Sequence, residues 1–137
     1  MYKKSLFFLK FICMQILLIG IGGFLGAVSR FFVQKMLSNL TSTFPIGILT
    51  VNVLGSFLLG VILYGISFDR HLTIDIRDFF AIGFMGSFTT MSAFSHDTLL
   101  LFEQGHITFT ILNVILNVVL CLLGVYLGKQ VGVAISR

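Results

Sequence analysis

Residues 83–95 read GFMGSFTTMSAFS and lie in the middle of the third of four long apolar segments. Small and hydroxyl residues make up much of this stretch, namely Gly86, Ser87, Thr89, Thr90, Ser92 and Ser95. Glycine loosens a helix, and hydroxyl groups compete for its backbone hydrogen bonds. Irregular backbone at membrane depth persists only where protein or water surrounds it. The stretch therefore predicts a broken helix whose freed carbonyls and hydroxyls face a partner or a pathway. An unbroken helix with close-packing small residues is the alternative.

Composition sets the class of protein. Of the 137 residues, 57% are hydrophobic and 10% are charged, and the mean hydropathy is +1.06. Soluble domains carry about 25% charged residues, so the composition predicts an all-α integral membrane protein. The net charge of +4 is better explained by attraction to a membrane surface than by nucleic-acid binding. The sequence contains neither a nucleotide-binding loop nor a redox motif, and we do not expect an enzyme.

The apolar segments predict four transmembrane helices, the third of them broken. We place them at Phe11 to Met36, Pro45 to Ile66, Phe79 to Phe102 and Ile107 to Val131. Each is long enough to cross a hydrocarbon core of about 30 Å. Residues 1–13 form a basic and aromatic lead that is either an extension or the result of an upstream start, because Met14 also resembles a natural start. Residues 14–137 then form the membrane domain.

Polar residues recur at helical spacing within three of the spans. Arg30 continues a glycine face of the first span, and it is either an interface anchor or a positive charge at the mouth of an anion route. Asn52 lies in the second span and Asn117 in the fourth. An amide in a bilayer helix needs partners, so Asn52 either bonds a neighbouring helix or lines a polar path as an uncharged donor.

Charged residues bear on orientation and coupling. The link from Ser67 to Asp78 reads as a solvated loop or a short interfacial helix. His96, Asp97 and Glu103 lie near the end of the third span, where ordinary interface residues are more common than a proton-coupling cluster. Basic residues favour cytoplasmic termini, but a start at Met14 would remove three lysines. The difference in basic residues between the two sides of the membrane would then be small. A small difference is typical of a protein that inserts in both orientations and forms an antiparallel dimer.

Taken together, these features resemble those of a known family, the small bacterial fluoride channels of the Fluc or CrcB family. The resemblance extends from Met14 to Gly128. It is carried by GGFLGAVSR in the first span, FPIGILTVNVLGSFLLG in the second, GFMGSFTTMSAFS in the third and NVILNVVLCLLGVYLG in the fourth. It implies a cell-membrane protein that forms an antiparallel dual-topology dimer with two narrow fluoride pathways. Passive export of F⁻ would lower cytoplasmic fluoride and protect against its toxicity.

The resemblance also implies roles for individual residues. The carbonyls of Gly86 and Thr89 would bind a structural Na⁺ at the dimer interface, one that is required for activity and is not transported. The pathway would be lined by Asn52, Phe88, Thr90, Met91, Ser92, Phe94, Ser95 and Asn117, with Arg30 biasing its vestibule toward anions. Phe94 would present the positively polarised edge of its ring to the ion.

Two departures from the family pattern stand in the third and fourth spans. Met91 replaces a second phenylalanine, and a hydroxyl residue is common in the family near Asn117. Methionine can fill the volume but has no ring edge to present to fluoride. Some relatives assemble from two unlike subunits. The partner is therefore either a second copy of this chain or a homologous subunit, and in the second case this chain would be inactive alone. A proton-coupled four-span transporter is a weaker alternative, because the first, second and fourth spans contain no Asp or Glu.

Overall fold

The computed structural model describes residues 2–40, 43–65 and 76–136, with side chains from Leu9 onward. Within these ranges every regular element is a helix. The predicted link from Ser67 to Asp78 lies for the most part outside the described residues, as does Ile66 at the end of the second predicted span.

Three helices are long and apolar. α1 spans Tyr2–Leu37, α2 spans Ile46–Gly65 and α6 spans Ile107–Ile135. Among the described residues these three have the length and hydropathy needed to cross a membrane. α1 begins before the predicted Phe11 because no helix-breaking residue separates Tyr2 from it, and α6 continues past Val131 through Gly132 to Ile135. α2 begins directly after Pro45, as expected of a residue that lacks an N–H to donate.

The third apolar segment is divided. It consists of the π-helical η1 (Asp78–Met85), the short α4 (Gly86–Phe88) and α5 (Met91–Glu103). Thr89 (φ −80°, ψ 157°) and Thr90 (φ −151°, ψ 118°) between them are extended. The prediction of a broken helix is therefore confirmed, and the unbroken alternative is wrong.

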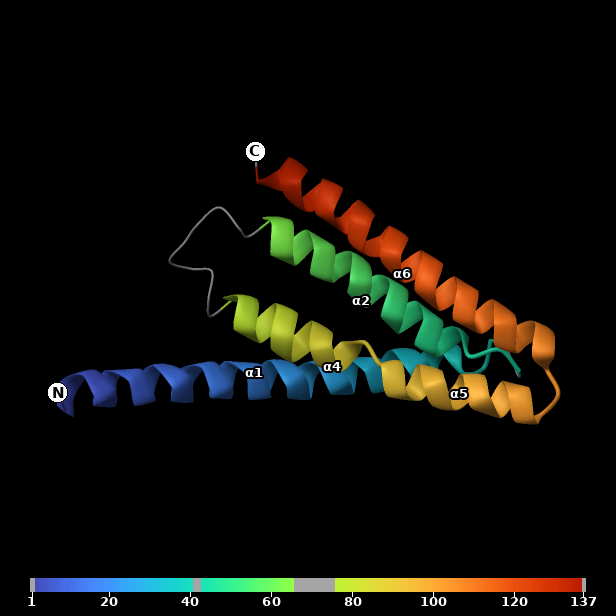
Figure 1. Ribbon diagram of the computed structural model, residues 1–137, viewed down its shortest axis with the longest axis horizontal. Coiled ribbons are helices and arrows are strands. Elements are labelled where there is room, and N and C mark those ends of the chain that lie inside the picture. Colours follow the sequence, from blue (N-terminus) through green and yellow to red (C-terminus); the bar gives the residue numbers. More distant parts are fainter. Residues whose placement is uncertain (1, 41–42, 66–75, 137) are drawn as a thin grey trace.

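The helices run alternately in opposite directions. In Figure 1, α2 and α6 lie side by side and run the same way, whereas α1 and the divided third segment run the other way. A tight turn at Gly105 (φ 79°) joins α5 to α6. Its N–H donates to the Phe102 carbonyl at 3.0 Å and the His106 N–H donates to the Leu101 carbonyl at 2.9 Å, so backbone hydrogen bonds to the last turn of α5 close the hairpin.

Glycines let the helix backbones touch at two places. A Cβ on Gly22 or Gly26 of α1 would overlap the backbone of Phe79 or Phe84 in the third segment. A Cβ on Gly128 of α6 would overlap the Phe57 carbonyl of α2. The small-residue strip predicted along the first span is therefore the surface on which the third segment packs.

Large apolar side chains cover the outside. Phe24 is 67% exposed on α1, and Leu122 is 68% exposed on α6. The interior instead contains an amide, because Asn113 is fully buried alongside Val51. A chain with apolar residues outside and amides inside is suited to a lipid environment, where the interior must satisfy its own polar groups.

Candidate functional site

The break at Thr89 and Thr90 is held in place by a side chain from α2. Asn52 accepts from the Thr90 N–H through Oδ1 at 2.8 Å and donates to the Thr90 carbonyl through Nδ2 at 3.2 Å. Both residues are buried. The Asn52 amide thus pairs with both backbone groups of Thr90, as a neighbouring strand would. An unpaired buried backbone group costs about 1–3 kcal/mol, so Asn52 stabilises the extended conformation.

The two N–H groups that would close the helix are diverted to side chains. In an α-helix the carbonyl of residue i accepts from the N–H of residue i+4. The Thr90 N–H, the regular donor to Gly86, bonds Asn52. The Ala93 N–H, the regular donor to Thr89, bonds the Thr90 hydroxyl at 3.2 Å, an N-cap for α5. The carbonyls of Gly86 and Thr89 are thereby released from regular helical bonding.

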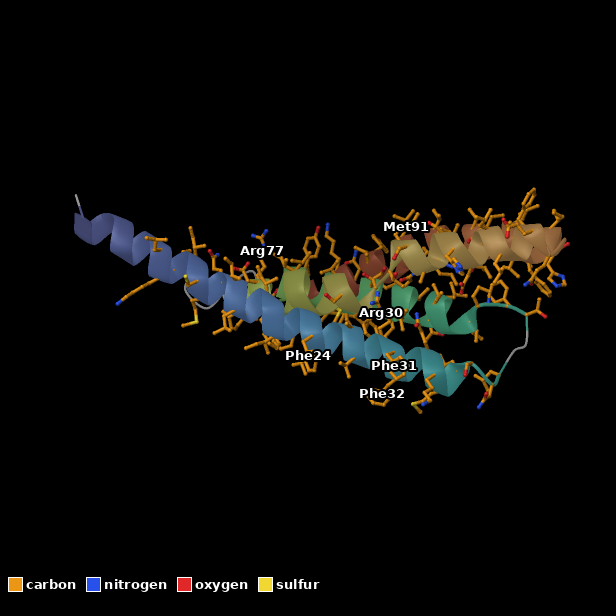
Figure 2. All side chains as sticks on the ribbon, turned by 90° about the horizontal axis from the view of Figure 1, so that it is seen from below. Phe24, Arg30, Phe31, Phe32, Arg77 and Met91 are labelled. Carbon is orange, nitrogen blue, oxygen red and sulfur yellow. The ribbon has the colours of Figure 1, made fainter. Side chains whose placement is uncertain are left out.

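Several predicted pathway residues meet in one groove of about 400 Å³ between α2, α5 and α6. Its lining includes Asn52, Thr90, Met91, Phe94, Asn117 and Cys121. Phe94 is buried and Met91 is 71% exposed. Figure 2 shows Met91 on the opposite side of the molecule from Phe31 and Phe32 of α1. The groove therefore opens on the face of the chain away from α1.

The remaining predicted pathway residues lie outside this groove. Phe88 is buried and stacks on Phe84 with ring centroids 6.0 Å apart. Ser92 and Ser95 are exposed on α5, and the Ser95 hydroxyl donates to the Met91 carbonyl at 2.9 Å. Arg30 is half-buried on α1. Only part of the predicted set thus meets within a single chain.

Two acidic residues differ in their surroundings. Asp97 lies 3.2 Å from His96 Nδ1, and that His96 side chain is 74% exposed. Asp78 is buried at the start of η1, where it accepts a hydrogen bond from Gln15 at 2.8 Å. Within the described ranges no group of three or more His, Cys, Asp or Glu is placed to hold a metal.

Asn113 and Thr98 were missed as site residues by the sequence reasoning. Asn117 donates to the Asn113 side chain at 3.0 Å, and Asn113 donates to the Thr98 hydroxyl at 2.8 Å. The spacing of four between the two asparagines was a usable signal. Nothing in the sequence distinguishes Thr98 from other threonines.

Helices that bury amides, expose apolar surface and include three of membrane-crossing length define a multi-pass membrane protein. The family described as CrcB-like protein, Camphor Resistance (CrcB), matches residues 17–129, and the chain belongs to it.

Named relatives agree with this assignment. A protein of Shewanella sp. (strain W3-18-1) called fluoride-specific ion channel FluC is 44% identical over 117 residues, which is 85% of this chain and 94% of that protein. One of Shewanella baltica (strain OS185) with the same name is 45% identical over the same shares.

Proposed function

We propose that this chain forms a fluoride-specific ion channel through which F⁻ leaves the cell passively. The observation that carries the proposal is the 44–45% identity to proteins with that name over 94% of their length. The groove supports it, because it combines amide donors with the ring of Phe94 and contains no carboxylate among its lining residues.

Three of the expected membrane spans are the helices α1, α2 and α6. In this proposal the divided segment between α2 and α6 is the remaining one, which gives four spans. The pieces from Asp78 to Glu103 follow one another in the same direction, opposite to α2 and α6 (Figure 1). Extended backbone at membrane depth requires internal partners, and Asn52 supplies them at Thr90. The Thr90 backbone can therefore lie within the bilayer with both of its polar groups paired.

The assembly is an antiparallel dimer, with a second copy of this chain or a homologous subunit as partner. On α4 and α5 the exposed residues include Gly86, Met91, Ser92 and Ser95. Glycine and hydroxyl residues that face lipid make no stabilising contact there. At a helix–helix interface, small residues allow the helices to pack closely. A partner on this face would also close the groove into a pathway.

A structural Na⁺ fits the break. The carbonyls released by the diverted Thr90 and Ala93 N–H groups belong to Gly86 and Thr89, the two residues that the family resemblance implies as Na⁺ ligands. Carbonyl oxygens are suitable donors for a hard monovalent cation. Gly86 is exposed and Thr89 half-buried, so each chain would present two oxygens to a shared ion. The bound ion would join the subunits and raise the local positive potential.

No energy source is needed for export. An inside-negative potential of about 100 mV contributes about 2.3 kcal/mol toward the exit of each anion. The cell would lose fluoride down its electrochemical gradient as soon as a selective path exists.

The test is an efflux assay. Purified protein in liposomes loaded with potassium fluoride is given a potassium ionophore, and external fluoride is followed with a selective electrode. Rapid efflux is expected, with no comparable release from chloride-loaded liposomes. Efflux at the rate of protein-free liposomes, or equal chloride release, would contradict the function. If the chain is silent alone but active after co-expression with a homologous subunit, the unlike pair is the functional form.

A further inference from the structure

The two amides that line the groove use their donors within the protein. Asn52 donates through Nδ2 to the Thr90 carbonyl at 3.2 Å and to Asn117 Oδ1 at 3.0 Å. Asn117 donates through Nδ2 to the backbone and side-chain oxygens of Asn113, both at 3.0 Å. An NH₂ group has two N–H bonds, so neither amide keeps a free N–H for an ion in this arrangement.

The two threonines of the groove lining are paired as well. Thr89 donates its hydroxyl hydrogen to the Met85 carbonyl at 2.9 Å. The Thr90 hydroxyl accepts from the Ala93 N–H at 3.2 Å and lies 3.2 Å from the Ser92 hydroxyl. Both threonine hydroxyls are therefore engaged within the protein.

Ser56 lines the groove with a hydroxyl that is not engaged. It is half-buried on α2 and has no hydrogen-bond partner among the described residues. A hydroxyl within a helix can donate to the carbonyl four residues earlier, as Thr50 of α2 does to Ile46 at 2.8 Å. Ser56 makes no such bond to the Asn52 carbonyl. Its oxygen is also accessible, because the side-chain atom that is both buried and unpaired in the described ranges is Gln34 Nε2.

The place of Ser56 in the groove follows from the contact of α2 with α6. Ser56 comes four residues after Asn52, which is one helical turn or about 6 Å along α2. A Cβ added to Gly124 of α6 would lie 3.6 Å from the Ser56 Cβ, so Ser56 lies where the two helices are close. Cys121 lines the groove from α6, but a thiol is only a weak donor. Ser56 is thus the groove-lining hydroxyl that remains without a partner.

We propose that the Ser56 hydroxyl donates a hydrogen bond to fluoride in the groove and is a specificity-determining residue of the pathway. The inference rests on the proposed fluoride conduction. A small, strongly hydrated anion must exchange water for donors of the protein, and a hydrogen bond to an anion is charge-assisted and strong. Chloride is larger and a weaker acceptor, so it gains less. The surroundings favour negative charge, because α5 begins at Met91 in the groove lining and a helix N-terminus carries partial positive charge.

The functional test compares Ser56→Ala, which removes the donor, with Ser56→Cys, which replaces it with a weaker donor of similar size. Fluoride efflux from liposomes should fall about tenfold in Ser56→Ala, as expected from the loss of a hydrogen bond to a charged group. The fall should be smaller in Ser56→Cys. Ser29→Ala is the matched control, because Ser29 is half-buried on α1 and outside the groove lining, and it should match wild type. Wild-type efflux in Ser56→Ala would overturn the proposal.

A second measurement uses the wild-type protein and does not depend on transport. In protein labelled with ¹³C and ¹⁵N in lipid bilayers, solid-state NMR assigns the Ser56 Cβ signal through its neighbours Gly55 and Phe57. Replacing chloride with fluoride should shift the Ser56 signal and leave the Ser29 signal in place. An unshifted Ser56 signal would overturn the proposal. If the wild type conducts no fluoride but the Ser56 signal shifts, the proposed function fails and the anion contact stands.

Discussion

At the scale of single residues, Asn52 both stabilises the helix break and lines the groove. Its amide could have been either an interhelical bond or a pore-lining donor, and the structure shows it bonded to Thr90 and Asn117 while also lining the groove. The helix break and the candidate pathway therefore depend on the same side chain. Its part in conduction stays a prediction, and the structure indicates that removing it would also weaken the fold.

Asn52→Ala is expected to reduce fluoride flux and to cost about 1–3 kcal/mol of stability, because the Thr90 backbone loses its partners. Flux in liposomes and thermal unfolding in detergent measure the two effects. Asn39→Ala, on an exposed residue, is the control. Unchanged flux in Asn52→Ala would remove Asn52 from the pathway.

Met91→Phe tests whether the pathway wall is aromatic in design. Met91 is 71% exposed in the single chain, so a larger ring meets no obstacle there, and it would supply a polarised edge to the anion. Fluoride flux should be preserved or raised. Met36→Phe, at a residue that is 77% exposed on α1, should change nothing. If Met91→Phe loses the folded dimer and Met36→Phe does not, the surface that packs against Met91 is shaped for methionine.

At the scale of elements, the sequence predicted most of the fold. Apolar length placed α2 and α6 to within a few residues, and the run of glycine and hydroxyl residues located the break at Thr89. The predicted start of the first helix at Phe11 was wrong. The basic and aromatic residues before Phe11 suggested a boundary, but none of them breaks a helix, and α1 begins at Tyr2. The hydrogen bond between Asn52 and Asn117 was not predicted, because it depends on α2 and α6 meeting at one level, and the spacing of residues within one helix does not contain that information.

Helix packing at α1 can be tested with one pair of variants. A Cβ on Gly26 would overlap the Phe84 carbonyl, whereas Gly20 has no atom within 4 Å of that position. Gly26→Ala should therefore cost about 1–3 kcal/mol through overpacking. Gly20→Ala should be neutral or stabilising, since alanine favours helix by about 0.8–1 kcal/mol. Equal unfolding temperatures for the two variants would contradict the packing of the third segment on α1.

At the scale of the whole molecule, the proposed dimer accounts for features of the single chain. Its groove is open, Gly86 beside the break is exposed and its outer face is apolar. A dimer joined by Na⁺ would resolve these features together. Replacing sodium with a larger organic cation throughout purification should then abolish flux or dissociate the dimer, as followed by efflux and size-exclusion chromatography. Full activity without sodium would contradict the assignment of Gly86 and Thr89.

The central claim is selective passage of fluoride, and the most direct measurement is the reversal potential in a planar bilayer. With unequal fluoride and equal, high chloride on the two sides, we predict that the current through the wild-type protein reverses at the Nernst potential of fluoride. A reversal near zero, set by chloride, or the absence of any protein-dependent current would contradict it.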